Sequence, residues 1–155
     1  MTDATTDATP ALSDSLALYQ EIMGRYGERV KNAHQDGKLL GWLDSLFGAT
    51  ELFWTMGIVP FTPVSNAIAL FTAGQGYDYL ELGERHGIAP EMCSAHRVVV
   101  GMAGENILDP PDLLVSTAHC CDSGLKVFEI LSDFYGCPNY FWDCGYSLDQ
   151  GSMDY

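Results

Sequence analysis

A strand, a helix and a second strand follow one another near the C-terminal end of the sequence, and this run constrains the fold most strongly. Residues 112–117 are an apolar stretch typical of a buried strand. The segment 123–135 has helical periodicity, and Gly136 and Pro138 predict where it ends. The aromatic-rich residues 139–143 predict another strand. Since a helix that joins two neighbouring strands leaves them parallel, this run predicts an α/β fold with a parallel sheet.

The rest of the sequence continues this alternation. Segments with helical spacing alternate with short apolar runs, and glycine or proline separates one segment from the next. This order predicts a doubly wound parallel sheet of Rossmann or flavodoxin type, with about four strands and flanking helices. Pro60 places its strand near a sheet edge or a strand end. The further expected helices span residues 12–33, 49–56, 66–73, 77–86 and 95–104, and the further expected strands span residues 38–43 and 58–61.

The length of 155 residues suits about one domain. Residues 1–10 are rich in Thr, Asp and Ala and predict a disordered leader, while residues 11–155 predict one N-terminal α/β domain. Residues 149–155 have the pattern of a first helical turn or two without a C-terminal cap, and a four-stranded sheet would leave an open edge. We therefore expect the sequence to be the N-terminal part of a longer chain, without its second domain.

The charge of the chain excludes several classes of function. Lysine and arginine number 7 against 21 aspartates and glutamates, which gives a formal net charge of -14. Phosphate backbones would be repelled, so we do not expect nucleic-acid binding. No uncharged apolar run approaches the roughly 20 residues of a membrane span. The first residues lack the basic and apolar regions of a signal peptide, so we expect a cytoplasmic protein with no membrane partner.

Two cysteines stand where a loop is predicted to turn into a helix. Cys93 precedes the expected helix 95–104, and Cys121 lies between the expected strand 112–117 and helix 123–135. A helix N-terminus favours a thiolate, and this end of an α/β unit is where ligands gather. The odd total of 5 cysteines and the absence of a Cys-x-x-Cys pair argue against disulfides and against the usual zinc signature. Two isolated cysteines on adjacent turns can hold part of an iron–sulfur cluster.

The order of three motifs adds a family resemblance. They are a Glu-Leu segment ending in Gly-x-x-Pro at residues 50–60, a Cys-Ser-x-x-Arg turn at residues 93–97, and a strand, Cys-Asp pair and helix at residues 113–129. With these motifs the chain resembles the N-terminal domain of 2-hydroxyacyl-CoA dehydratase and benzoyl-CoA reductase subunits. The resemblance covers nearly all of the chain but under half of a full subunit of that family.

The resemblance implies an oxygen-sensitive, anaerobic radical enzyme. Cys93 and Cys121 would be ligands of a [4Fe–4S] cluster, with a third cysteine from a second domain that has no counterpart here. A paralogous subunit would complete a heterodimer, and an ATP-hydrolysing activator protein would donate one electron. The substrate would be a CoA thioester, reduced to a ketyl radical anion that expels a hydroxyl group in the dehydratases, which are lyases. In the reductases, which are oxidoreductases, the aromatic ring is reduced instead.

Four other residues are candidates for the site. Glu51 could donate a proton near the thioester, or only satisfy the dipole of a helix start. Arg97 could contact a CoA phosphate or stabilise the reduced cluster, or lie exposed on its helix. His119 could donate a hydrogen bond to a ligand sulfur. Asp122 is expected to cap the following helix and thereby position Cys121.

The remaining notable residues favour structural interpretations. Cys120 is expected to point away from the cluster into packing, and Cys137 and Cys144 are expected to be structural or surface thiols. His96 is expected on the exposed side of its helix. The aromatic residues 140–142 are expected to form a core strand. No Walker or dinucleotide fingerprint is present, since glycine pairs such as those at 74 and 76 are too common to predict a nucleotide loop.

Three functions remain open on the sequence. The first is an iron–sulfur subunit of a dehydratase or benzoyl-CoA reductase type of enzyme, inactive as an isolated chain. The second is a double-cubane type of iron–sulfur reductase that acts on small molecules. The third is an inactive fragment or interaction module that keeps the fold without a cluster. Counting iron and sulfide after an anaerobic preparation would separate the third from the others.

Overall fold

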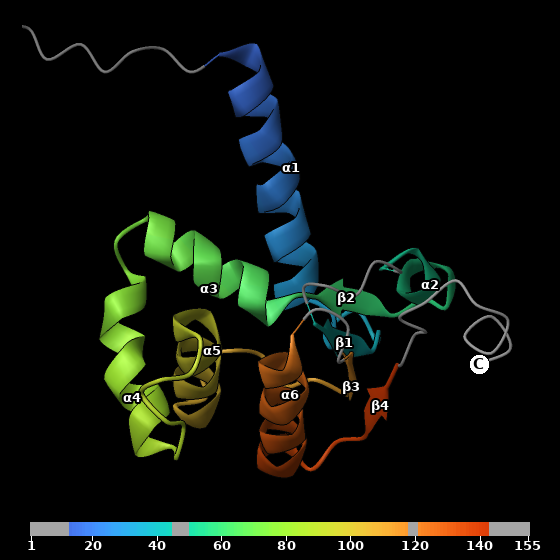
Figure 1. Ribbon diagram of the computed structural model, residues 1–155. Coiled ribbons are helices and arrows are strands. Elements are labelled where there is room, and N and C mark those ends of the chain that lie inside the picture. Colours follow the sequence, from blue (N-terminus) through green and yellow to red (C-terminus); the bar gives the residue numbers. More distant parts are fainter. Residues whose placement is uncertain (1–12, 45–49, 118–120, 143–155) are drawn as a thin grey trace, which may run out of the picture.

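A computed structural model gives the structure of the protein and describes residues 13–44, 50–117 and 121–142 (Figure 1). The described elements confirm the expected type and order of helices and strands. The predicted leader, residues 1–10, and the predicted final helical turns, residues 149–155, lie outside the described residues. The elements are α1 (Asp14–Lys31), β1 (Leu40–Leu43), α2 (Thr50–Thr55), β2 (Val59–Phe61), α3 (Pro63–Thr72), η1 (Gly76–Tyr79), α4 (Leu80–Arg85), α5 (Ser94–Gly104), β3 (Leu113–Ser116), α6 (Asp122–Tyr135) and β4 (Asn139–Phe141).

The four strands form one parallel sheet in the order β2-β1-β3-β4, which confirms the predicted fold class. Strand β2 lies at an edge, as Pro60 predicts. The chain runs outward from β1 to β2 and then returns to place β3 on the other side of β1. The carboxyl ends of β1 and β3 are therefore neighbours at a topological switch point, where open α/β sheets bind their ligands. The backbone N–H of Asp44, directly after β1, donates to the carbonyl of Val115 at 3.0 Å.

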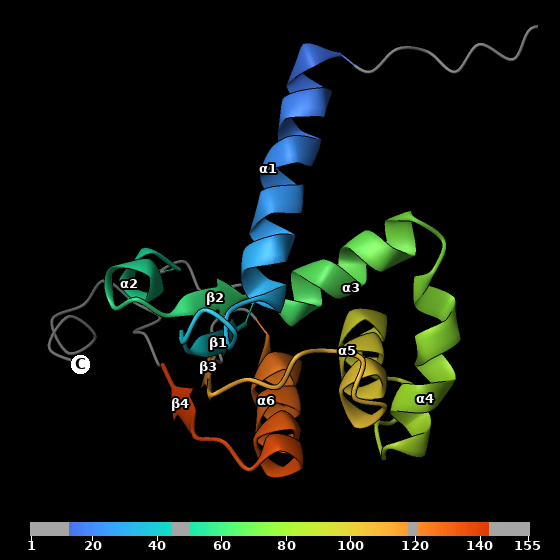
Figure 2. The same ribbon diagram turned by 180° about the vertical axis from the view of Figure 1, so that it is seen from behind.

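The main core lies between one face of the sheet and the helices α5 and α6 (Figures 1 and 2). Trp42 of β1 and Leu114 of β3 are fully buried there, together with Val98 of α5 and Phe128 of α6. The two strand residues alternate with neighbours whose side chains face the other side of the sheet, as the two-residue period of a strand requires. The buried apolar surface thus fixes α5 and α6 against the same two strands that meet at the switch point.

Helices α4 and α5 approach each other closely because glycines lie at their contact. A Cβ atom at Gly83 would lie 2.2 Å from the carbonyl oxygen of Arg97, and one at Gly101 would lie 2.5 Å from that of Tyr79. Neither distance is possible for a real side chain, so only glycine permits this spacing. The close contact holds α5 in place from the side opposite the sheet.

The other face of the sheet is covered only in part by described residues. Leu43, Phe53, Ile58 and Val115 form a small core beneath the six-residue helix α2. Beyond it lies an apolar groove of about 810 Å³, lined by Leu39, Leu52, Met56, Leu113, Pro138, Tyr140, Phe141, Trp142 and their neighbours.

The expectation that residues 140–142 form a core strand is wrong. Tyr140 is 60% exposed, and Phe141 and Trp142 are also exposed. The reason is topological: β4 is an edge strand, and α2 is too short to cover the sheet as far as β4. Aromatic composition predicted the strand but not its burial.

Helix α1 extends away from the rest of the molecule (Figures 1 and 2). Its C-terminal part is anchored, since the Tyr26 hydroxyl donates to the carbonyl of Pro60 at 2.8 Å and Val30 is buried. Leu16, Tyr19 and Ile22 are exposed along its outer turns. Among the described residues, no helix is long and apolar enough to cross a membrane.

Candidate functional site

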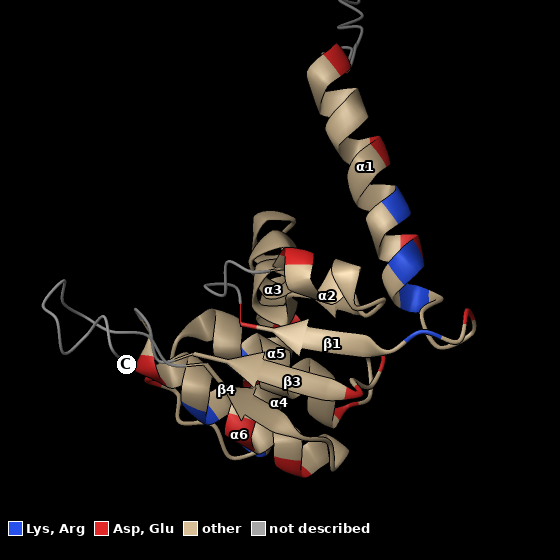
Figure 3. Cartoon of the chain, turned by 90° about the vertical axis from the view of Figure 1, so that its right-hand side faces the viewer, with Lys and Arg blue, Asp and Glu red and all other residues tan. Residues whose placement is uncertain are grey.

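The candidate site lies at the carboxyl ends of β1 and β3, which point the same way (Figure 3). Two helices begin here, and each has a cysteine at its N-cap position. Cys93 precedes the 11 residues of α5, and Cys121 precedes the 14 residues of α6. Neither thiol makes a side-chain capping hydrogen bond to its own helix. The unpaired N–H groups and the positive end of each helix dipole favour an anionic sulfur at both positions.

A hydrogen bond brings the starts of the two helices together. The Ser123 hydroxyl in the first turn of α6 lies 2.8 Å from Nδ1 of His96, which is in the first turn of α5. The same hydroxyl lies 3.0 Å from the sulfur of Cys121. Cys93, three residues before His96, is exposed, and Cys121 is partly buried. The first turns of α5 and α6, with their N-cap cysteines, are thus neighbours.

The expectation that His96 lies on an exposed helix face is wrong, since its side chain is only 3% exposed. Helix α5 is buried on most sides, with Ala95 and every residue from 98 to 103 also buried, and the His96 side chain faces α6 rather than solvent. Burial lowers the pKa of His96, while the carboxylate of Asp44 acts in the opposite direction. His96 is therefore held as a neutral imidazole, able to donate or to accept a hydrogen bond at Nδ1.

Asp44 is a buried carboxylate at the switch point that the sequence analysis did not single out. It is 1% exposed, and its Oδ2 atom lies 2.2 Å from where a Cβ atom of Gly124 would be. The carboxylate is thus packed directly on the first turn of α6, where the helix dipole favours a negative charge. The signal that could have found it is its position, one residue after a buried strand in the first βα turn.

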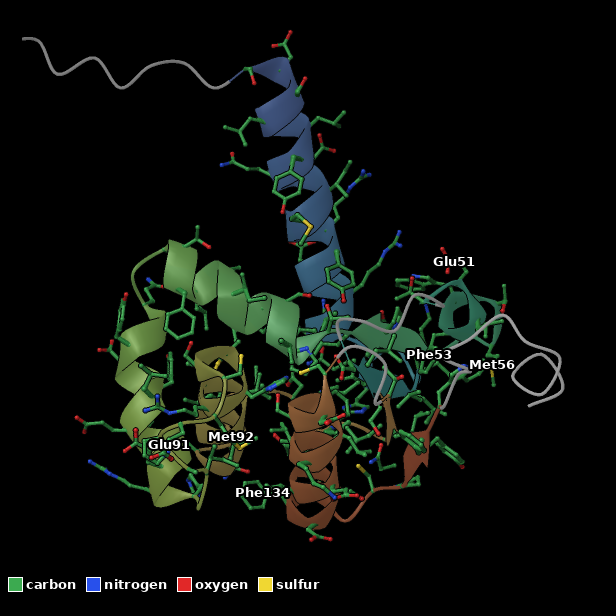
Figure 4. All side chains as sticks on the ribbon, viewed as in Figure 1. Glu51, Phe53, Met56, Glu91, Met92 and Phe134 are labelled. Carbon is green, nitrogen blue, oxygen red and sulfur yellow. The ribbon has the colours of Figure 1, made fainter. Side chains whose placement is uncertain are left out.

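The structure gives the other predicted residues different surroundings. Glu51 is exposed on α2, far from Met92 beside Cys93 (Figure 4). Asp122 is the first residue of α6 rather than its cap, because Cys121 occupies the N-cap position, so that expectation is corrected. It still places a negative charge in the first turn. His119 lies outside the described residues.

Arg97 connects α5 to neighbouring segments. Its guanidinium forms an ion pair with Glu84 of α4 and donates to the carbonyl of Pro90 at 3.2 Å. The Arg97 side chain is only 14% exposed. These bonds tie α5 to α4 and to the segment that leads into Cys93. A contact with a CoA phosphate would have to compete with them.

The thiols of Cys93 and Cys121 have the donor chemistry of cluster ligands, but they form only part of a ligand set. Within residues 13–44, 50–117 and 121–142, no group of three or more His, Cys, Asp or Glu side chains could hold a metal ion. Cys137 is partly buried and packs against the main core, and burial raises the pKa of its thiol. It has the surroundings of a structural thiol. Cys120 and Cys144 lie outside the described residues.

Comparison with known proteins gives two matches. The model of a family described as 2-hydroxyglutaryl-CoA dehydratase, D-component, matches residues 45–155. The chain is also 23% identical over 136 residues to the (R)-phenyllactyl-CoA dehydratase alpha subunit of Clostridium sporogenes. That match covers 84% of this chain and 33% of the relative, so the chain spans about a third of the length of the curated relative that it matches.

Proposed function

Because the chain belongs to the 2-hydroxyglutaryl-CoA dehydratase D-component family, we propose that it is part of a subunit that removes water from a 2-hydroxyacyl-CoA thioester. The observation that carries the proposal is the pair of adjacent helix starts, each with a cysteine at its N-cap, at the switch point of a parallel sheet. The name of the matched relative, a dehydratase alpha subunit, supports the same chemistry.

We propose Cys93 and Cys121 as ligands of a [4Fe–4S] cluster. Two thiolates at helix N-termini fit the charge and donor chemistry of such a group, and further ligands would come from outside the described residues. When bound, the cluster would supply single electrons and an iron atom open to an oxygen ligand. Ser123 would hold the sulfur of Cys121 through its hydrogen bond, and α4 would keep the start of α5 in place.

Glu51 would not act beside Cys93 within this domain. Its exposed position on α2 supports the alternative interpretation, a carboxylate that satisfies a helix start. Asp44 is the buried carboxylate near the two helix starts. Packed on the first turn of α6, it fixes where that helix begins and hence where Cys121 lies.

We propose a paralogous subunit as partner and an ATP-dependent activator protein as the electron donor. The relative's name contains the words alpha subunit, which supports a second kind of subunit in the assembly. A benzoyl-CoA reductase or a double-cubane reductase would use a similar cluster. Assays of the assembled complex separate them: water loss from 2-hydroxyacyl-CoA supports the dehydratase, and ring reduction supports the reductase.

The ligand assignment is tested with cysteine variants prepared anaerobically in the assembled complex. Cys93→Ser and Cys121→Ser are expected to lose most of the iron and sulfide, because a hydroxyl is a poor cluster ligand. Cys137→Ser is the matched control, since this thiol packs against the core, and it should keep nearly all of both. The charge-transfer absorption of iron thiolate should follow the iron content.

Equal loss from all three variants would show that the assignment is wrong. A wild-type complex without iron or sulfide would favour the inactive interaction module instead.

A further inference from the structure

The Ser123 hydroxyl lies between two partners that can each donate or accept a hydrogen bond. Its oxygen is 3.0 Å from the sulfur of Cys121 and 2.8 Å from Nδ1 of His96. A hydroxyl has one hydrogen, so it can donate to only one of these partners at a time. Sulfur, hydroxyl and imidazole therefore form a chain in which the hydrogens run in one direction or in the other.

The protonation state of Cys121 selects the direction. An imidazole nitrogen is a much stronger acceptor than a thiol sulfur, so beside a thiol the hydroxyl donates to Nδ1, and the ring hydrogen is on Nε2. Metal ligation removes the thiol hydrogen and leaves an anionic sulfur, which attracts the hydroxyl hydrogen. The Ser123 oxygen then accepts from Nδ1–H, and Nε2 carries no hydrogen.

His96 responds as a neutral ring. It is buried, burial lowers its pKa, and Asp44 is the charged group that acts on it in the opposite direction. A change of tautomer therefore lets His96 donate to Ser123 when Ser123 donates to the sulfur, without placing a positive charge in the core.

We propose that Ser123 and His96 form a hydrogen-bond relay that stabilises Cys121 as an anionic metal ligand, with the His96 hydrogen on Nε2 beside the thiol and on Nδ1 beside the metal-bound sulfur. The relay rests on the proposed function, because it requires Cys121 to be a metal ligand. The hydrogens balance: the thiol proton is released to water, and the ring exchanges one N–H for the other. Ser123 and His96 are positioning residues, since both act through Cys121.

The tautomer of His96 is measured by nitrogen NMR of the assembled complex in which this chain carries ¹⁵N-labelled histidine. The His96 signals are assigned by comparison with His96→Phe. Nε2–H is expected in the metal-free complex, and Nδ1–H after anaerobic reconstitution with iron and sulfide. Ser123→Ala removes the hydroxyl that connects Cys121 to His96, so the ring should keep the same tautomer with and without iron and sulfide. Ser123→Thr keeps a hydroxyl and should retain the switch.

A second probe separates failure of the relay from failure of the cluster. Cd²⁺ is thiophilic, and ¹¹³Cd NMR reports directly whether sulfur binds it. A switch with Cd²⁺, together with an assembled complex that holds no iron, would support the relay and reject the proposed cluster. Nε2–H in a complex with a full complement of iron and sulfide would reject the relay alone. An unchanged tautomer with either metal bound also rejects it.

The midpoint potential of the cluster gives an independent readout. A hydrogen bond to a ligand sulfur stabilises the more negative, reduced cluster. Ser123→Ala is therefore expected to lower the equilibrium constant for reduction about tenfold. This corresponds to a decrease in the midpoint potential of roughly 59 mV for one electron. Ser123→Thr should stay near the wild-type potential. Equal shifts in both variants would indicate a role in packing only, and no shift in Ser123→Ala would overturn the relay.

Discussion

Gly124 has a structural role that helix propensity alone would not suggest. A glycine inside a helix usually costs about 1 kcal/mol relative to alanine. Here the space that a Cβ atom would occupy is taken by the carboxylate of Asp44, at 2.2 Å. The glycine allows a buried anion to lie on the first turn of α6, directly beside the segment that holds Cys121.

Gly124→Ala is expected to destabilise the protein by about 1–3 kcal/mol, because Asp44 must move in a packed core. Urea unfolding measures this change. Gly24→Ala is the matched control: Gly24 lies within α1, and a Cβ there meets nothing within 4 Å. It should stabilise the chain by up to about 1 kcal/mol. If both variants changed stability in the same direction, Asp44 would not occupy this space.

At the level of elements, the α4–α5 contact determines where Cys93 lies. Gly83 and Gly101 permit the close approach, and the ion pair between Arg97 and Glu84 fixes it. The same contact engages the guanidinium of Arg97. Its residue type suggested an anion contact at the site, but a carboxylate of α4 engages the guanidinium.

Gly101→Ala is expected to push α4 away from α5 and to lower stability by about 1–3 kcal/mol. The melting temperature should fall by roughly 2–4 °C per kcal/mol in a chain of this size. Because the start of α5 would shift, iron retention in the assembled complex should fall as well. Gly27→Ala in α1 is the control, with nothing near its Cβ position. An unchanged melting temperature in Gly101→Ala would contradict the close packing.

At the level of the whole molecule, one face of the sheet is well covered and the other carries an apolar groove of about 810 Å³. Contiguous apolar surface of this kind is typical of a site that contacts another protein surface. Electrostatic repulsion from the net charge of -14 opposes association but does not remove the apolar area. We therefore expect the chain to self-associate when expressed alone.

Tyr140→Lys is expected to weaken this self-association, because Tyr140 lines the groove and is 60% exposed. Sedimentation velocity and the binding of a hydrophobic dye measure the effect. Ile68→Lys adds the same charge at an exposed position of α3 that does not line the groove, so it should leave association largely unchanged. Equal effects of the two substitutions would assign the change to net charge. A monodisperse wild-type monomer that binds no dye would contradict the prediction.

The order of helices and strands and the parallel sheet could be predicted from the sequence. These depend on local properties: the apolar period of residues 112–117 and 123–135, and the ends marked by Gly136 and Pro138. The sequence also identified Cys93 and Cys121 as residues at helix starts, because the signals for the start of a helix lie within a few consecutive residues. Their role as cluster ligands stays a prediction.

The surroundings of those cysteines depend on tertiary packing and could not be predicted from the sequence. His96 faces α6 because α5 is buried on most sides, and Asp44 lies on Gly124 because β1 and β3 are neighbours at the switch point. Tyr140 is exposed because β4 is an edge strand. Each of these facts depends on packing between segments far apart in the chain, and hydrophobic periodicity carries no information about which distant segment will lie opposite a given side chain.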